Sequence, residues 1–198
     1  MMYIKTNKDA PNIMHIIPPG SRGAEIGVWM GNTSQRFLER GVEHLYLVDS
    51  YSVEPYKNNS EATYDEYLAK YSKVTGEFTE AGFTRYYDNV YKSVVDKFKG
   101  DPRVTVCRMT SDQWFANQDD DILDWIYVDG DHSYEGCFRD LNNALSKVKK
   151  GGMILGDDYG HAGSRWQKPG VTKAVNEFCF ENDFTPIRHG ETQFQINT

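Results

Sequence analysis

Residues 122–135 read ILDWIYVDGDHSYE, and this stretch decides the fold. Its first part, Leu123–Val128, is a short run of apolar and aromatic residues, which is typical of a strand buried in a parallel sheet. Acidic residues and a glycine follow at once, and helical spacing continues over Tyr134–Lys149 until a glycine pair ends it. A strand, a polar turn and a helix in this order predict one βα unit of a parallel sheet.

The same alternation recurs on both sides of this stretch. Further buried strands are predicted at Gly23–Val28, His44–Val48, Val104–Arg108 and Gly152–Leu155. Further helices are predicted at Thr33–Arg40, Tyr86–Phe98 and Val171–Glu181.

The C-terminal segment departs from this pattern. Two short strand-like pieces, Thr185–Arg188 and Gln193–Ile196, are separated by only a few residues, and so tight a link joins antiparallel neighbours. We therefore expect an α/β, doubly wound, Rossmann-like fold. Its seven-stranded sheet would be mostly parallel, with one antiparallel strand near the C-terminal edge and helices on both faces.

The chain is expected to form one domain, residues 1–198, with an insertion at about 51–85. The insertion is polar, holds five of the 13 tyrosines and is much longer than an ordinary βα connection, which takes about two to six residues. A helix is expected within it at Glu61–Ser72. The insertion is predicted to be a cap or lid over a substrate, and a surface excursion or a homodimer contact is the alternative.

Composition excludes several classes of protein. Lys and Arg number 22 against 29 Asp and Glu, so the net charge of −7 argues against binding nucleic acid through its phosphates. Aromatic residues make up 14% of the chain, too many for a disordered protein. No apolar run approaches the roughly 20 residues that cross a membrane. The first residues lack the apolar core of a secretory signal, and the three scattered cysteines form no disulfide framework, so we expect a cytoplasmic protein.

Acidic residues follow two neighbouring predicted strands. Asp129 ends one strand, and Asp157 and Asp158 end the next, so their carboxylates should meet at one edge of the sheet. Three carboxylates repel one another unless a cation lies among them, and oxygen ligands select a hard ion such as Mg²⁺. His132, three residues after Asp129, is a candidate for proton transfer. Solvated loop acids without a metal are the alternative.

The first predicted strand leads into a glycine-containing turn, EIGVWMGNT, over residues 25–33. Gly27 and Gly31 allow the backbone to approach a ligand closely. Glu25 is a carboxylate among apolar neighbours, which is costly unless a cation or hydrogen-bond donors pair with it. Asp49, at the end of the second strand, suits a ribose diol and disfavours a phosphate.

These motifs together resemble the class I S-adenosylmethionine (SAM)-dependent methyltransferases. More narrowly, the Glu25-to-Gly31 turn, Asp49, the stretch YVDGDHSY and the stretch GGMILGDD are similar to the metal-dependent sugar O-methyltransferases of the macrocin and mycinamicin type. Trp29 departs from the glycine that many methyltransferases have in this turn.

The resemblance implies a role for each matching residue. Glu25, Gly27 and Gly31 would hold the methionine end of SAM, Asp49 its ribose, and Ser111 and Asp112 would border its adenine, with Asp129 at the same edge. Asp129, Asp157 and Asp158 would hold Mg²⁺, and His132 would be the general base. The substrate would be a hydroxylated small molecule such as a sugar or catechol.

Three other functions stay open. An NAD-dependent oxidoreductase would share the fold, although the turn lacks the third glycine of the dinucleotide fingerprint. An Fe(II)-dependent oxygen enzyme would need a second histidine, for which His161 is available. A non-catalytic nucleoside-binding protein would not need the acids and His132. Arg165, Trp166 and Lys168 lie in a loop that would meet an anionic or ring-shaped substrate.

Overall fold

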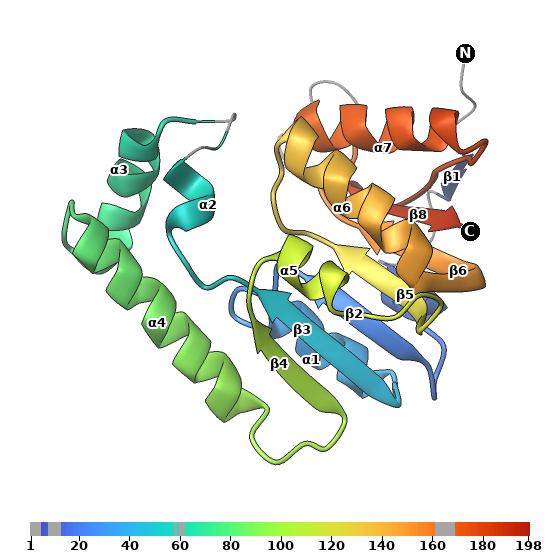
Figure 1. Cartoon of the computed structure of the whole chain (residues 1–198), viewed down its shortest axis with the longest axis horizontal. Helices are drawn as coiled ribbons and strands as arrows, with labels where there is room; N and C mark the ends of the chain where they lie inside the picture. Colours follow the sequence, from blue (N-terminus) through green and yellow to red (C-terminus); the bar gives the residue numbers. More distant parts are fainter. Residues whose placement is uncertain (1–4, 8–12, 58, 60–61, 161–168) are drawn as a thin grey trace.

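One eight-stranded sheet forms the centre of the computed structural model (Figure 1). The structure describes residues 5–7, 13–57, 59, 62–160 and 169–198. The strand order is β1-β7-β8-β6-β5-β2-β3-β4. The strands are β1 (Lys5–Asn7), β2 (Arg22–Ile26), β3 (His44–Asp49), β4 (Val104–Arg108), β5 (Leu123–Val128), β6 (Val148–Gly156), β7 (Ile187–His189) and β8 (Gln193–Asn197).

The predicted doubly wound sheet is confirmed. Its seven predicted strands correspond to β2–β8, and β8 runs antiparallel to both of its neighbours, β6 and β7, while the other pairs are parallel. The reversed strand thus lies near the C-terminal edge, as the short link after β7 predicts. The three-residue β1 pairs with β7 and extends this edge by one strand that the sequence did not reveal.

Helices follow the strands in the expected alternation. They are η1 (Ile13–Ile16, a 3₁₀ helix), α1 (Asn32–Glu39), α2 (Glu54–Lys57), α3 (Tyr64–Thr75), α4 (Glu80–Lys97), α5 (Ser111–Ala116), α6 (Tyr134–Lys147) and α7 (Pro169–Glu181). None of the helices in the described part of the chain has the length and apolar character of a membrane span.

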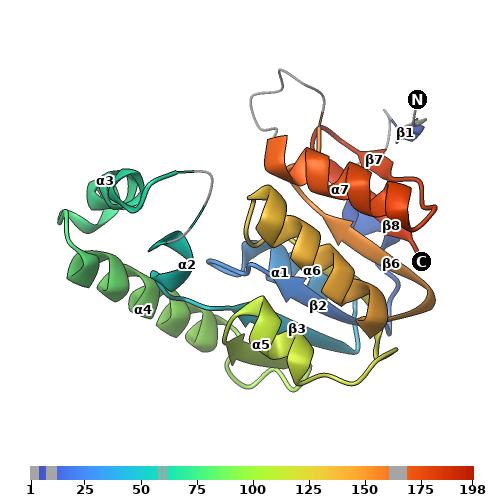
Figure 2. The ribbon, with the colours of Figure 1, turned by 45° about the horizontal axis from the view of Figure 1, so that its top comes forward.

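The two faces of the sheet are covered by different helices (Figure 2). Along β5, Trp125 and Tyr127 pack into a core with residues of η1, α1 and α4, while Ile126 and Val128 pack into a second core with residues of α5, α6 and α7. This alternation is the period of two that a strand imposes on its side chains. All four side chains are buried, which explains why the strand is apolar from Trp125 to Val128.

The insertion between β3 and β4 is helical and holds α2, α3 and the first turns of α4. Its helices lie to one side of the sheet (Figure 1). The rings of Tyr56, Tyr71, Phe83 and Tyr87 contact one another and form the interior of this segment. The tyrosines of the polar insertion therefore pack against one another and against the core on the α4 side of the sheet.

Two element boundaries differ most from those expected, and one helix was missed. Helix α4 begins at Glu80 instead of Tyr86, because the Thr79 hydroxyl accepts a hydrogen bond from the Gly82 N–H and caps it. Strand β6 begins at Val148, where a helix was expected to continue to Lys149, because Val148 pairs with Leu123 of β5 and is buried. Helix α5 was not predicted.

Candidate active site

The carboxyl ends of β5 and β6 bring two acidic stretches together. These strands pair in parallel, with Val128 opposite Gly156, so Asp129 and the pair Asp157-Asp158 emerge side by side. In open α/β sheets, ligands bind beyond these carboxyl ends of the strands.

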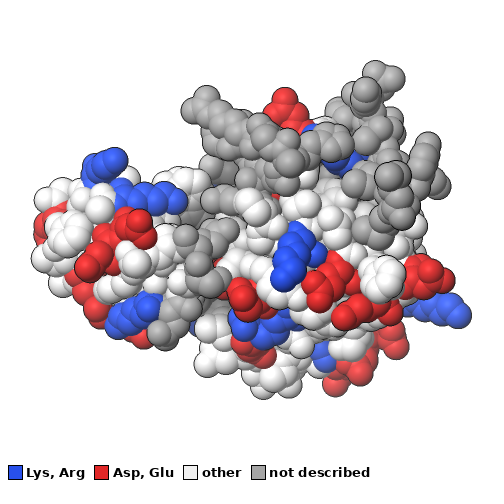
Figure 3. All heavy atoms as spheres, turned by 90° about the horizontal axis from the view of Figure 1, so that it is seen from above, with Lys and Arg blue, Asp and Glu red and all other residues white. Residues whose placement is uncertain are grey.

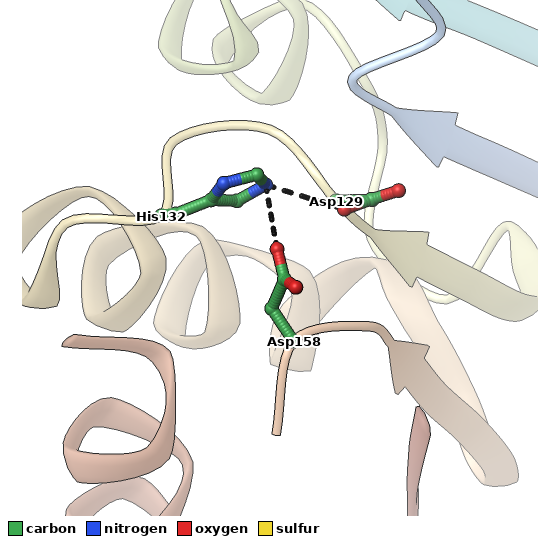
Figure 4. A group of neighbouring side chains, drawn as sticks. All are labelled: Asp129, His132 and Asp158. Atoms are coloured by element: carbon green, nitrogen blue, oxygen red, sulfur yellow. Dashed lines mark hydrogen bonds and ion pairs between the residues drawn. The ribbon is translucent and has the colours of Figure 1, made fainter. Parts of the chain in front are cut away.

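His132 lies between two of these carboxylates (Figure 4). Its Nε2 atom is 3.3 Å from Asp129 Oδ1 and 3.2 Å from Asp158 Oδ2. One ligand atom from each of the three residues lies within 4.8 Å of the others, close enough for all three to contact one ion. The side chains are 31%, 29% and 19% exposed for His132, Asp129 and Asp158, so the group is open to solvent and to a ligand.

Asp157 lies at the expected end of β6, but its side chain bonds outside this group. Its Oδ1 accepts hydrogen bonds from the Thr192 hydroxyl and, at 2.8 Å, from the Asp158 N–H. Its Oδ2 lies 3.4 Å from the hydroxyl of Tyr127. Asp157 therefore ties the end of β6 to the segment before β8, while His132 joins Asp129 and Asp158 in the group.

The surroundings of Asp129 make its ionised form costly. The pKa of Asp129 is raised, chiefly by desolvation, and His132 opposes that rise by its hydrogen bond and its charge. A nearby cation stabilises the ionised form of such a carboxylate and so lowers the cost of its ionisation. The protonated imidazole and a bound metal ion are both suited to that position.

The glycine turn after β2 passes directly under Asp129. Gly27 has φ +88°, and a Cβ at this position would lie 2.1 Å from the Asp129 carbonyl oxygen. Its N–H donates to the Val48 carbonyl oxygen at 2.9 Å. Gly31 has φ +67° and precedes the first residue of α1. Gly27 is therefore glycine because no side chain fits between the ends of β2 and β5.

Asp49 ends β3 beside this turn. Its two carboxylate oxygens accept hydrogen bonds from the N–H groups of Trp29, at 2.9 Å, and Tyr51, at 2.8 Å. Desolvation raises its pKa even so. Trp29 itself has φ +47°, is half exposed, and donates from its indole Nε1 to the Tyr86 hydroxyl of α4 at 2.9 Å. The turn is thus joined to the insertion.

Glu25 lies beneath the turn, with only 1% of its surface exposed. The hydroxyl of Ser34, in α1, donates to its Oε2. Burial raises the pKa of Glu25 well above its ordinary value, and the negative charges of Asp129 and Asp49 add to that rise. The expected carboxylate is therefore at the expected place, but it is fully covered and paired with a serine.

Residues 24–159, more than half of the chain, match the family described as "Methyltransferase domain". The chain belongs to this family. It is also 42% identical, over 55 residues, to an uncharacterized protein of Acanthamoeba polyphaga mimivirus, and the match spans 28% of this chain and 24% of that protein.

Solved structures share the fold of this methyltransferase domain. The O-methyltransferase NovP superposes with a TM-score of 0.56 at 19% identity, over 93% of this chain and 74% of NovP. Fibrillarin of Aeropyrum pernix, solved with natively bound SAM, superposes with a TM-score of 0.57 at 9% identity, over 91% of this chain and 67% of its own. At these identities the likeness shows the fold alone.

The start of α5 in the methyltransferase domain holds the two residues expected near adenine. The Ser111 hydroxyl donates to Asp140 Oδ1 at 2.6 Å, and the exposed Asp112 forms an ion pair with Arg139 at 3.0 Å. Asp140, in α6, is 2% exposed, and burial raises its pKa to about 7. Local sequence offers no signal for this buried acid, because Asp140 stands within an otherwise ordinary helix.

Four residues considered from the sequence, His161, Arg165, Trp166 and Lys168, lie outside the described residues.

Proposed function

We propose that this methyltransferase domain transfers the methyl group of SAM to a hydroxyl oxygen of a small molecule, with a divalent cation at the site. The observation that carries the proposal is the convergence of Asp129, His132 and Asp158 next to the Gly27 turn. Binding of a sulfonium cofactor and removal of a proton from an oxygen are the two tasks that such a reaction needs.

The residues around the turn fit SAM. Gly27 brings the backbone of the turn against Asp129, and Asp49 stands at the end of the neighbouring strand, where an acid suits ribose hydroxyls. Asp49 offers a carboxylate beside the turn, and the cost of ionising the buried Glu25 would fall when a positively charged ligand binds nearby. When bound, SAM supplies a methyl group already activated by the positive charge on its sulfur.

The donor atoms fit a divalent cation. Asp129 and Asp158 would hold it through carboxylate oxygens, the ligands that Mg²⁺ and Mn²⁺ prefer. Such an ion lowers the pKa of a hydroxyl that touches it.

His132 would accept the proton of the substrate hydroxyl at Nε2, the atom that faces both carboxylates. Asp129 and Asp158 stabilise the imidazolium that results, because each offers an oxygen within 3.3 Å of that nitrogen. The chain thereby places a base, its counter-charge and the cofactor turn at one edge of the sheet.

The charge of the surface supports a small-molecule substrate. On the face seen in Figure 3, the described Lys and Arg side chains are interspersed with Asp and Glu and form no extended basic surface. With a net charge of −7, the protein would repel a phosphate backbone. Molecules with two adjacent hydroxyls, such as sugars and catechols, are favoured because both oxygens are able to contact one cation.

The test is transfer of a labelled methyl group from SAM to a panel of catechols, sugars and RNA, with Mg²⁺ or with EDTA. We expect transfer to a diol that EDTA abolishes and that the His132→Ala variant reduces by about 100-fold or more, with SAM binding retained. His44→Ala is the matched control. His44 is the first residue of β3, so it lies at the amino ends of the strands, away from the candidate site, and it contacts Thr105. Full activity of His132→Ala would refute the role of the histidine, and transfer to RNA instead of diols would refute the substrate class.

A further inference from the structure

Asn59 connects the insertion to the loop that carries His132. This residue lies between α2 and α3, and its Nδ2 donates to Asp131 Oδ1 at 3.0 Å. On its other side, Asn59 Oδ1 accepts a hydrogen bond from the Tyr67 hydroxyl of α3, also at 3.0 Å. A chain of hydrogen bonds therefore runs from α3 to the residue next to His132.

The carboxylate of Asp131 shapes the backbone around His132. Its Oδ1 also accepts a hydrogen bond from the Ser133 N–H at 2.9 Å. Gly136, in the first turn of α6, leaves room for it, since a Cβ there would lie 2.3 Å from Asp131 Oδ2. The Asp131 carboxylate thus holds the peptide group that follows His132, and Asn59 is a side-chain donor to that carboxylate.

The insertion gives Asn59 a firm support. The Tyr67 ring meets the Tyr56 ring edge-on at 4.7 Å, and Tyr56 packs in turn against Phe83 of α4 at 5.3 Å. Phe83 is buried in the core that α4 shares with the sheet. The support of Asn59 is therefore continuous with the core on the α4 side of the sheet.

We propose that Asn59 is a positioning residue, which holds Asp131 and thereby directs the His132 imidazole toward the reacting oxygen. Its effect on catalysis rests on the function proposed above, while its effect on the loop does not. The insertion would then be part of the active site and not a surface excursion.

The first test measures how well the loop around His132 is protected from hydrogen exchange, without any ligand. Hydrogen exchange of the amides of residues 131–137 is compared in the wild type, Asn59→Ala, Asn59→Asp and Tyr67→Phe. Asn59→Asp keeps the size of the side chain and the oxygen that accepts the hydrogen bond from Tyr67. It loses the amide group that donates to Asp131 and places a second carboxylate next to the Asp131 carboxylate. We expect exchange about two- to tenfold faster in both Asn59 variants, because each loses the hydrogen bond to Asp131.

Two further variants calibrate this result. Tyr67→Phe keeps the ring and removes only the hydrogen bond from Tyr67 to Asn59. It should therefore give a smaller increase in the exchange rate. It also provides the test if an Asn59 variant fails to fold. Asn142→Ala removes another asparagine donor, from an exposed residue of α6 that bonds to the Phe138 carbonyl oxygen, and should leave exchange at 131–137 unchanged. Wild-type exchange in Asn59→Asp would overturn the proposal.

The second test is kinetic. We expect kcat to fall by about 10- to 100-fold in both Asn59 variants, with the Kd for SAM unchanged, because a small misplacement of a catalytic group slows the reaction without weakening the cofactor. A loss confined to KM, or restored activity in Asn59→Asp, would contradict the positioning role. If the wild type transfers no methyl group but its Asn59 variants exchange faster, the connection stands and only the proposed function fails.

Discussion

Two carboxyl groups, those of Glu25 and Asp140, are buried below the loops of the site, and each accepts a hydrogen bond from one serine hydroxyl. Burial of an ionised carboxylate is costly, and one hydroxyl offsets only part of that cost. The pKa of each group is therefore raised, that of Asp140 to about 7. At neutral pH these acids make the folded protein less stable than amides of the same shape would.

The Asp140→Asn variant tests this at one position. Because the folded protein holds the Asp140 proton more tightly than the unfolded chain does, the contribution of Asp140 to wild-type stability falls as pH rises from about 4 to about 7. The change in pKa from 3.8 to about 7 corresponds to as much as about 4 kcal/mol. Urea unfolding at pH 4 and pH 8 should show the variant gaining stability over the wild type only at pH 8. An equal difference at both values would contradict the buried, titrating acid.

The sequence predicted the place of the acids but not the direction of each side chain. That Asp129, Asp157 and Asp158 meet at one edge follows from the parallel pairing of β5 and β6. That Asp157 turns to Thr192 depends on a loop 35 residues away, which local sequence does not reveal. The roles assigned to Glu25, Asp49 and His132 stay predictions.

At the scale of elements, the turn after β2 depends on a glycine that meets another strand. Gly27 combines φ +88° with a close approach to the Asp129 carbonyl oxygen, whereas Gly76, at the end of α3, has φ +73° and no atom within 4 Å. Both positions strain any other residue, but only Gly27 also leaves no room for a side chain.

The two alanine variants separate these effects. Gly76→Ala should cost about 1–2 kcal/mol of unfolding free energy from its backbone conformation alone. Gly27→Ala should cost at least about 2 kcal/mol more, because β2 and β5 must move apart, and it should weaken SAM binding. Urea unfolding gives the comparison, and equal losses at the two glycines would contradict the close approach.

Elements with strong local signals were predictable, and those defined by distant contacts were not. The central strands were found because branched and aromatic runs are buried on both faces. Helix α5 has only six residues, too few to show a period, and β1 has three. The start of β6 was missed because the charged and glycine residues after Val148 do not look like a strand, although its pairing with Leu123 makes them one.

At the scale of the whole molecule, the chain joins a doubly wound sheet to a helical insertion, and the candidate site lies at the carboxyl ends of β5 and β6. The turn after β2 contacts the insertion through Trp29 and Tyr86, and the His132 loop contacts it through Asn59. Two independent hydrogen bonds thus connect the insertion to the turn after β2 and to the His132 loop. A change in the insertion is expected to affect both.

Thermal unfolding with SAM, S-adenosylhomocysteine or NAD tests the proposed cofactor most directly. A ligand at 100 times its Kd adds about 2.7 kcal/mol, and about 2–4 °C per kcal/mol for a protein of this size gives a rise in Tm of about 5–11 °C. We predict this rise with the two adenosyl compounds and none with NAD. An unchanged Tm with both adenosyl compounds, or an equal rise with NAD, would contradict the assignment of the Gly27 turn as a SAM site.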